Sequence, residues 1–453
     1  MGEESSAATL VDARGTVDIG HVLDRGGWSP YQRWVVFLAA FATTFDGLDI
    51  QLLGVAIPSI MKDWNVTRGD FVPLIAIGLV GMSIGTLVAG NLGDRFGRRI
   101  ALLGSIVTFG FFTALSSQAD SMTSLTILRF LAGLGLGGGL PNGVSLASEF
   151  VPLRHRGFAV TLTIVCVPLG GVLAGFIGSE VLPVYGWRTL FVIGGVLPLV
   201  AALFLAFTLP ESLRFMARQP DRWPQLRQVL SRFNPAAAAA TAFTDDSEKA
   251  LRRASLGALL TSDLRRDTLM LWGSFLSCLL AVYLGFNWLP SMLSGAGLDV
   301  GVSSRGLLFF NLGGVVGALV AAMFIAKLGS KPTMLTVAAI AIVGGLILMA
   351  TPISTATSGV MIVTMLAITG GGINATQCLL FALAAYVYPT TVRASGIGAA
   401  NAVGRAGALL SSVAGALALD RGGSQAFFFL MGGAMMATFA FLTVLRRHLP
   451  KVV

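Results

Sequence analysis

The sequence predicts an all-α membrane protein whose twelve transmembrane helices form two six-helix bundles. Three observations lead to this prediction. The chain has 453 residues, of which 55% are hydrophobic and only 12% are charged, whereas roughly 25% of residues are charged in a soluble domain. Apolar stretches long enough to cross a bilayer, which takes about 20 residues, recur twelve times. A polar segment divides these stretches into two sets of six.

The order of the elements follows from where the apolar stretches begin and end. Residues 1–32 are polar and lack the short apolar core of a cleaved signal peptide, so we interpret them as a cytoplasmic tail. Residues 210–267 are rich in arginine and are expected to form a partly helical cytoplasmic linker. Residues 33–209 and 268–446 are the two bundles, and 447–453 form a second tail. The twelve expected spans lie at about 34–58, 71–91, 100–118, 123–146, 158–179, 188–208, 268–292, 304–326, 333–351, 358–382, 395–418 and 425–445.

The distribution of positive charge predicts the orientation. Most of the 31 Lys and Arg residues fall in the tails, the linker and the alternate loops that share one side of the membrane. Positive residues accumulate in cytoplasmic loops, so we expect a multi-pass protein of the cell inner membrane with both termini in the cytoplasm. This topology also explains the net charge of +9, and no nucleic-acid partner is needed to account for it.

Two carboxylates lie in the middle of the first apolar stretch. Asp46 and Asp49 are three residues apart and therefore share one face of a helix. A charged Asp at bilayer depth costs roughly 2.5–3.5 kcal/mol on insertion scales, so such a pair is tolerated when it faces a polar cavity or is partly protonated. We predict a proton-coupling or substrate site here. The alternative is a cavity-facing pair that only braces neighbouring helices.

Arg129 and Arg405 lie inside expected spans and need polar partners there. The guanidinium group matches a carboxylate in two parallel hydrogen bonds and stays charged at any working pH. Either arginine is therefore a candidate for binding a substrate carboxylate. Each has an alternative role in a structural salt bridge to Asp46, Asp49 or Glu149.

Further polar and aromatic residues in the second half are candidates for lining a substrate pocket. Aromatic rings stack on an aromatic substrate, and an amide or phenol bonds a ring hydroxyl. For any single aromatic residue, packing against lipid or another helix is an equally good explanation, whereas amides within a span need polar partners. The candidates are Tyr283, Asn287, Trp288, Asn311, Asn374 and Gln377, with Phe309 and Phe310 beside them.

Several other patterns do not indicate a function. The glycine-rich run Gly133–Gly138 lies inside an apolar span with no preceding strand, so close helix packing explains it better than a nucleotide-binding loop. The three cysteines and three histidines show no metal-ligand spacing. We therefore predict no metal, no cofactor and no enzyme activity.

The two halves of the chain repeat one motif at matching places. Residues 90–99 read Gly-Asn-Leu-Gly-Asp-Arg-Phe-Gly-Arg-Arg and follow the second span, and residues 322–331 follow the eighth span in the same way. A weaker echo relates residues 154–157 to residues 393–396. Internal repeats of this kind are typical of transporters in which two bundles rock around a site at the membrane midplane.

The signature at 90–99 and the twelve spans resemble the major facilitator superfamily. Within it, the chain is similar to the aromatic acid:proton symporters from about Gln32 to Arg446. The resemblance rests on Asp46-Gly47-Leu48-Asp49, on residues 129–142 (Arg-Phe-Leu-Ala-Gly-Leu-Gly-Leu-Gly-Gly-Gly-Leu-Pro-Asn) with Ser148-Glu149, and on Tyr388-Pro389 with Arg393-Ala394-Ser395-Gly396. It implies import of benzoate-, hydroxybenzoate-, vanillate- or phenylpropionate-type anions. It also adds Asn142 to the substrate-binding candidates and Glu149 to the proton-coupling candidates.

The resemblance also implies a cytoplasmic gate. Asp94 is expected to cap a helix of the opposite bundle, and Arg98 is expected to pair near Glu149. One departure is that Ala326 stands where the signature of the second half has an acidic residue, so control of the gate is expected to be asymmetric. The gating candidates are Asp94, Arg95, Arg98, Arg99 and Arg393.

These observations predict a symporter that uses the proton gradient to import an aromatic carboxylate for the catabolism of aromatic compounds. Its expected partners are the substrate, protons and membrane lipid, and we expect a monomer. The alternatives within the same fold are a sugar porter, another organic-anion porter and a drug/proton antiporter. A membrane enzyme or a receptor is disfavoured because no catalytic constellation or signalling domain is present.

Overall fold

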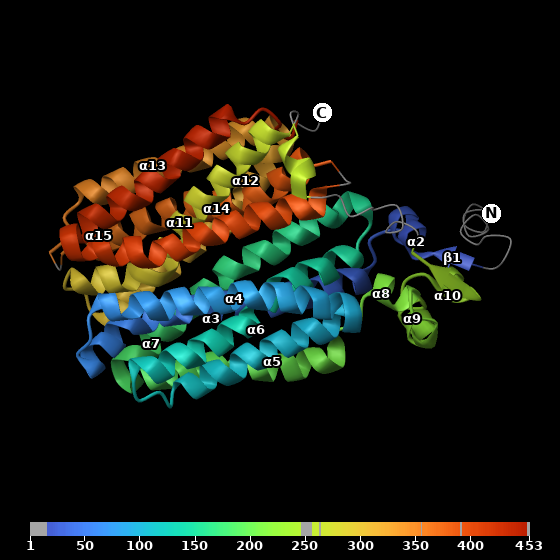
Figure 1. Ribbon diagram of the computed structural model, residues 1–453, viewed down its shortest axis with the longest axis horizontal. Helices are drawn as coiled ribbons and strands as arrows, with labels where there is room; N and C mark the ends of the chain where they lie inside the picture. Colours follow the sequence, from blue (N-terminus) through green and yellow to red (C-terminus); the bar gives the residue numbers. More distant parts are fainter. Residues whose placement is uncertain (1–15, 246–255, 262–263, 355, 390–391, 451–453) are drawn as a thin grey trace.

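The computed structural model describes residues 16–245, 256–261, 264–354, 356–389 and 392–450, and it consists almost entirely of helices (Figure 1). Within these described residues, ten helices are long and apolar enough to cross a membrane. In the first half they are α3 (Pro30–Trp64), α4 (Arg68–Phe96), α5 (Arg98–Ser116), α6 (Met122–Glu149) and α7 (Leu153–Thr208). In the second half they are α11 (Arg265–Gly295), α12 (Val300–Leu328), α13 (Ser330–Ala350), α14 (Gly359–Val387) and α15 (Arg393–Val444).

Two of these helices each cross the membrane twice. The 56 residues of α7 contain a break at Gly186, where φ is 74° and ψ is 179°. The 52 residues of α15 contain a break at Gly423, where φ is 56° and ψ is −141°. Glycine accepts positive φ because it has no Cβ, so the chain turns back at both positions. The described residues therefore form twelve crossings, which confirms the predicted fold class.

The helices begin and end at local sequence signals. For α3, the Ser29 hydroxyl accepts from the Gln32 amide nitrogen and the Gln32 side chain accepts from the Ser29 amide, which is a complete capping box. Pro30 occupies the first turn, where its missing N–H costs nothing. The Gln32 side chain also donates to the carbonyl of Phe150 at 2.8 Å, which ties the start of α3 to the end of α6.

Glycines allow the helices to pack backbone against backbone. A Cβ on Gly47 of α3 would overlap the backbone of Val167 in α7, and one on Gly170 of α7 would overlap the backbone of Thr44 in α3. Without side chains at these points, α3 and α7 approach closely, as small residues allow in membrane helices. This contact holds the carboxylates of α3 at a fixed depth inside the first bundle.

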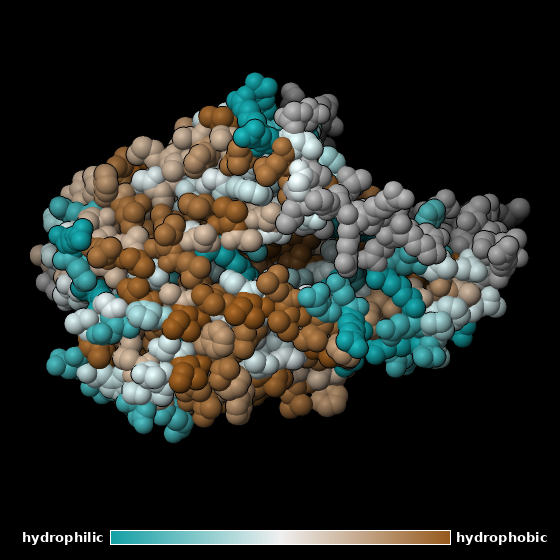
Figure 2. Space-filling model, in the orientation of Figure 1, coloured by the Kyte–Doolittle hydropathy of each residue, from teal (hydrophilic) through white to brown (hydrophobic). Residues whose placement is uncertain are grey.

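The outer surface matches a lipid environment. Figure 2 shows an apolar surface between the two ends of the molecule, with hydrophilic residues gathered at those ends. Large apolar side chains of the membrane-crossing helices are strongly exposed: Phe207 is 84% exposed, Val360 77% and Leu87 72%. An apolar exposed area of this extent is stable in lipid and not in water, which agrees with a multi-pass membrane protein.

The N-terminal segment and the linker fold together beside the first bundle, as Figure 1 shows at its right-hand end. Strand β1 (Thr16–Asp18) pairs in parallel with β2 (Ala242–Thr244), with Val17 opposite Phe243. We call residues 16–25 and 213–245 the tail–linker unit, and the end of the molecule that carries it the linker end. The other elements of the tail–linker unit are α2 (Ile19–Arg25), α8 (Leu213–Ala217), the 3-10 turn η1 (Pro220–Arg222), α9 (Trp223–Leu230) and α10 (Pro235–Ala238). Outside this unit, a second 3-10 turn, η2 (Leu256–Leu260), precedes α11.

The buried apolar side chains of the tail–linker unit belong to the same hydrophobic core as the bundles, and polar contacts also fix the unit to the first bundle. Val17 of β1 is fully buried and lies in this core together with its strand partner Phe243. The buried Asp245 carboxylate pairs with Arg214 at 3.3 Å and with Arg218 at 3.2 Å. Asp24 accepts from the amide nitrogen of Leu153, the first residue of α7, at 2.9 Å. The unit therefore moves with the first bundle.

Polar contacts between the two bundles, among the described side chains, lie at the middle of the molecule and at the end away from the linker. Arg68 of α4 pairs with Asp420 of α15 at 3.4 Å, and Arg305 of α12 pairs with Glu180 of α7 at 3.5 Å. Nearer the middle, the Asn311 amide donates to Gln51 at 2.7 Å. The bundles are therefore held together at the end opposite the linker, which we call the far end.

Candidate functional site

The centre of the first bundle contains a buried ion pair between a carboxylate of α3 and an arginine of α6. Arg129 Nη1 of α6 lies 3.3 Å from Asp49 Oδ2 of α3, and both side chains are almost fully buried. Thr113 of α5 donates its hydroxyl to the other oxygen of Asp49 and accepts from Arg129 Nη2 at 2.5 Å. The Arg129 guanidinium also lies over the Phe191 ring at 5.1 Å from the centroid. Arg129 therefore makes the salt bridge to Asp49 that the sequence analysis gave as the alternative to binding a substrate carboxylate.

Asp46 has a different environment, one turn away on the same helix. Its side chain is fully buried, and neither carboxylate oxygen has a hydrogen-bond partner among the described residues. A Cβ on Gly139 of α6 would overlap this carboxylate, so the glycine-rich stretch of α6 provides the space for it. A buried carboxylate without a partner is very costly when charged. This environment favours the protonated form.

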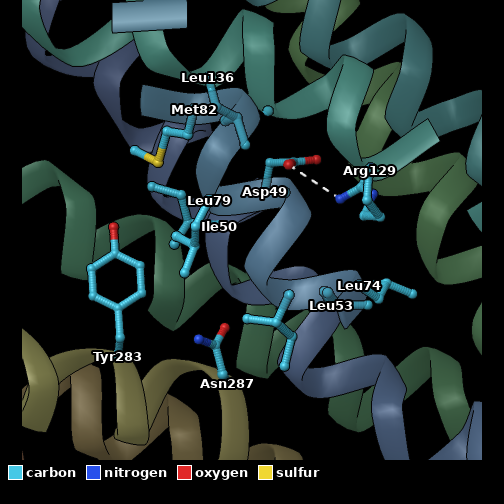
Figure 3. A pocket seen from close by; sticks show the side chains of 13 residues that line it. Asp49, Ile50, Leu53, Leu74, Leu79, Met82, Arg129, Leu136, Tyr283 and Asn287 are labelled. Atoms are coloured by element: carbon cyan, nitrogen blue, oxygen red, sulfur yellow. Dashed lines mark hydrogen bonds and ion pairs between the residues drawn. The ribbon is translucent and has the colours of Figure 1, made fainter. Parts of the chain in front are cut away.

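A cavity connects the Asp49–Arg129 pair with the second bundle (Figure 3). Its volume is about 50 Å³, well below the roughly 150 Å³ that holds a benzene ring. In this conformation the cavity is therefore too narrow for an aromatic ring. Tyr283 and Asn287 of α11 line it on the side of the second bundle, with both side chains directed towards the first bundle in Figure 3. Its apolar walls come from Ile50, Leu53, Leu74, Ile75, Leu79, Met82 and Leu136.

Arg405 of α15 lies near Tyr283 of α11, within the second bundle. Its guanidinium interacts electrostatically with the Tyr283 phenol, and its Nη1 is buried without a hydrogen-bond partner. Among the described residues no carboxylate lies within 4.0 Å of it. Unlike Arg129, Arg405 is therefore free to receive an anion.

The other five substrate-binding candidates lie outside the lining of this cavity. Trp288 is fully buried against α15 and donates its indole N–H to the Ser411 carbonyl at 3.1 Å. Asn142 bridges α6 and α4 by donating to the carbonyls of Gly138 and Ala89. Asn311 joins the two bundles, as described above, and Asn374 donates to Gly370 of its own helix at 3.0 Å. Gln377 is half-buried on α14. None of these five lines the central cavity in this conformation.

The acidic and basic residues of the 90–99 signature meet at the linker end. Arg98 pairs with Asp94 at 2.5 Å and lies 3.6 Å from Glu149, and the Ser212 hydroxyl donates to Glu149. Glu149 therefore belongs to this cluster and not to the aspartate pair in α3. Asp94 is expected from the resemblance to cap a helix of the opposite bundle, but here its partner is Arg98 of its own bundle. The reason is that the bundles contact each other at the far end.

The other gating candidates have separate environments. Arg95 is exposed and its guanidinium lies 5.3 Å from the Phe96 ring centroid. Arg99 donates from its side chain to the Ala206 carbonyl. Arg393 begins α15, and its side chain lies outside the described residues, as does the side chain of Ala326.

Glu211, which follows the first bundle, is a site residue that the sequence interpretation missed. Its carboxylate accepts from the amide nitrogens of Arg99 at 3.0 Å and Ser212 at 2.8 Å, so it lies at the positive N-terminal end of α5. A Cβ on Gly97 would overlap this carboxylate. Burial raises the pKa of Glu211, while the amide donors act in the opposite direction. The Pro-Glu-Ser sequence next to a span was the available signal.

Gln51 and Thr113 were also missed. Gln51 lies one half-turn beyond Asp49 in the same apolar stretch and is fully buried at the bundle interface. An amide within a span is a visible signal, so Gln51 was open to prediction. Thr113 has no such signal, because a threonine in a span commonly bonds to its own helix.

The protein has two bundles of six membrane-crossing helices, buried charged residues near the midplane, and ion pairs between the bundles at the far end. This arrangement is that of a membrane transporter. The chain belongs to the Major Facilitator Superfamily, whose family profile matches residues 39–412. Among curated relatives, it is 34% identical to the 4-hydroxybenzoate transporter PcaK of Pseudomonas putida, over 90% of each chain. It is 32% identical to the gallate transporter of Pseudomonas putida over 92% of each chain.

Solved structures agree with this assignment of the fold. The chain resembles the xylose transporter XylE from E. coli in a partially occluded inward-open conformation, with a TM-score of 0.72 and 17% sequence identity. The likeness covers 93% of this chain and 99% of that chain. The superfamily and its relatives are transporters, so the prediction of a transporter rather than an enzyme is confirmed.

Proposed function

We propose that this protein imports an aromatic carboxylate together with protons across the cell inner membrane. The observation that carries the proposal is a pair of buried groups beside the residues that line the central cavity. Asp46, a carboxylate without a hydrogen-bond partner among the described residues, lies one turn from the cavity residue Asp49, and Arg405, without an acidic partner among them, interacts with the cavity residue Tyr283. The first is suited to carry a proton and the second to bind an anion. The curated relatives, named for 4-hydroxybenzoate and gallate, supply the substrate class.

Arg405 binds the carboxylate of the substrate in this proposal. Its guanidinium offers two parallel donors, and its Nη1 is already desolvated, so an arriving carboxylate meets a donor that has lost its water. The aromatic ring then lies in the apolar part of the cavity, between Leu53, Leu79 and Met82. Tyr283 and Asn287 supply hydrogen bonds to ring hydroxyls. The cavity must widen before the ring enters, which couples binding to movement of the bundles.

Asp46 and Asp49 together set the coupling to protons. When Asp46 is neutral, Arg129 balances Asp49 and the centre of the first bundle carries no net charge. A substrate anion that moves with one proton transfers no net charge, and with two protons it gains about 2.3 kcal/mol per 100 mV of membrane potential. Glu149 is the alternative proton carrier, at the linker end.

The structure is an inward-facing state if the linker end is cytoplasmic, as the charge distribution predicts. The far end is then closed by Arg68–Asp420 and Arg305–Glu180, and both termini and the linker lie in the cytoplasm. The positive-inside rule supports this orientation, as does the position of the arginine-rich linker in Figure 1. Tags at residue 1 and at the C-terminus are expected to stay unreactive to an impermeant reagent in intact cells. The protein acts as a monomer in this proposal.

The decisive experiment is uptake of labelled 4-hydroxybenzoate, gallate, benzoate and xylose by proteoliposomes with an imposed pH gradient. We expect saturable accumulation of at least one aromatic acid that stops when a protonophore is added. Xylose should not be accumulated. Accumulation of xylose, or uptake of an aromatic acid that ignores the pH gradient, would contradict the proposal.

A further inference from the structure

The outer surface of the second bundle contains a groove that is separate from the central cavity. It lies between α12, α13 and α14, which are neighbours in the upper half of Figure 1, and its volume is about 690 Å³. Its lining is almost entirely apolar. The floor of the groove is a close contact between α12 and α14, where the backbone at Gly313 lies against Ala367 and the backbone at Gly317 lies against Gly371.

The groove runs along the membrane normal and opens towards lipid. On α12 its lining extends from Leu312 to Leu328, which at 1.5 Å per residue is roughly 24 Å. One leaflet contributes about half of the 30 Å hydrocarbon thickness, so the groove spans one leaflet and passes the midplane. Side chains that line the groove are accessible from the outside of the bundle, since Val316 is 54% exposed and Phe324 is 46% exposed. An acyl chain from the leaflet at the linker end has the shape and chemistry to fill it.

The linker-end opening of the groove is positively charged. Lys327 follows Phe324 by three residues and therefore continues the face of α12 that lines the groove. Lys331 starts the next helix, is exposed, and donates to the Thr443 carbonyl at 3.3 Å. Among the described residues, neither lysine has an acidic side chain within ion-pair distance. The sequence contains no Asp or Glu at all between Asp299 and Asp420.

The first bundle shows why this charge needs a partner. At the matching turn, Asp94 pairs with Arg98 and neutralises it. In the second bundle the acidic position is occupied by Ala326, so the protein itself supplies no carboxylate to Lys327 and Lys331. An anionic lipid headgroup in the leaflet at the linker end attracts such residues by about 1 kcal/mol for each Lys, which corresponds to roughly fivefold in affinity.

We propose that this groove is a binding site for one anionic phospholipid, with an acyl chain between α12, α13 and α14 and its phosphate at Lys327 and Lys331. The lipid replaces the missing acidic residue of the second-half motif and covers the apolar groove. This site is independent of the substrate cavity, so it does not depend on the transport proposal.

Native mass spectrometry of the purified full-length protein, titrated with phosphatidylglycerol or phosphatidylcholine of identical acyl chains, tests the proposal. The first phosphatidylglycerol is expected to bind at least fivefold more tightly than the first phosphatidylcholine. The Lys327→Gln, Lys331→Gln double variant should reduce this preference to about one. Lys62→Gln, which alters a lysine at the far end, is the matched control and should keep the preference.

A second pair of variants tests the groove. Val320→Trp, which places an indole in the groove, should weaken binding of both lipids by about the same factor, while Val343→Trp, an exposed change on α13 outside the groove, should not. Ile340→Trp fills the groove from the opposite wall and replaces Val320→Trp if that variant is not recovered folded. Equal binding of the two lipids to the unaltered protein, or an unchanged preference in the double lysine variant, would overturn the headgroup assignment. Unaltered binding in both groove-filling variants would overturn the site.

Discussion

The two buried arginines differ in their partners, and this difference predicts different phenotypes. Arg405→Ala should abolish substrate binding while leaving protein levels unchanged, because no ion pair is lost. Arg405→Lys should rescue poorly, since an ammonium group cannot form two parallel bonds to one carboxylate. Binding of a labelled aromatic acid to purified protein measures both effects. Normal binding in the Lys variant would contradict the bidentate role.

Arg129→Ala, in contrast, should destabilise the protein. It leaves Asp49 buried without its cation, and breaking a buried pair in this way costs about 3–5 kcal/mol. The double variant Arg129→Ala, Asp49→Asn removes the charge as well and should recover most of the thermal stability. Thermal unfolding in detergent is the measurement, and equal melting temperatures for the single and double variants would argue against the ion pair as a stabilising contact.

Substitutions of Asp46 and of Asp49 are likewise expected to have different effects. Asp46→Asn keeps the shape of the side chain but cannot exchange a proton, so we predict loss of proton-driven accumulation with retention of substrate counterflow. Asp49→Asn should lose accumulation too, and it additionally frees Arg129. Both activities are measured in the same proteoliposomes. Normal accumulation in both variants would mean that the proton is carried elsewhere, with Glu149 the next residue to test.

At the level of elements, the gate motifs of the two halves are not equivalent. Asp94 neutralises Arg98 beside Glu149, whereas Ala326 offers no acidic group. We predict that Asp94→Asn slows transport strongly and that Ala326→Asp changes it little. Initial uptake rates, normalised to protein in the membrane, provide the comparison. Equal sensitivity at the two positions would remove the argument for an asymmetric gate.

The strand pair of the tail–linker unit makes a second prediction for an element. Val17 is fully buried in β1, while its neighbour Thr16 is half-buried. Val17→Asp loses roughly 1.5–3 kcal/mol of apolar burial and also buries a charge, so the strand pair should open. Thr16→Asp is the matched control. Limited trypsin digestion measures the difference, with faster cleavage in residues 214–232 expected only for Val17→Asp.

For the whole molecule, closure at the far end can be trapped covalently. A Cβ built on Gly178 of α7 lies 3.4 Å from Ser304 Cβ of α12, close to the separation of about 3.5–4.5 Å in disulfides. The Gly178→Cys, Ser304→Cys variant should therefore crosslink under a mild oxidant, lose transport, and regain it on reduction. Each single variant is a control, which also shows whether Val55, the nearest side chain, adjusts to the added Cβ. Unimpaired transport in the crosslinked protein would contradict movement at this interface.

The sequence predicted the two sets of six crossings because the bilayer imposes length and hydrophobicity on every crossing. It also singled out Asp46, Asp49, Arg129 and Arg405, since charged residues inside spans are visible by composition alone. It did not predict that the N-terminal tail pairs with the linker through β1 and β2. It did not reveal which arginine is paired with which aspartate, because that depends on how α3, α5 and α6 rotate against one another. Trp288 and Asn142 illustrate the same limit: helical spacing gives the face of one helix, but the partner of that face is a tertiary property.

The pairing of β1 with β2 also determines the order in which parts of the chain can fold during synthesis. Thr16 pairs with Ala242, so the first strand has no partner until the ribosome has added the whole first bundle and most of the linker. At typical synthesis rates of about 5–20 residues per second, this delay is roughly 10–45 s. During that time six helices have entered the membrane while the tail waits outside it. A strand that is synthesised before the whole first bundle is therefore among the last parts of its half to fold, and its docking marks the completion of the first bundle.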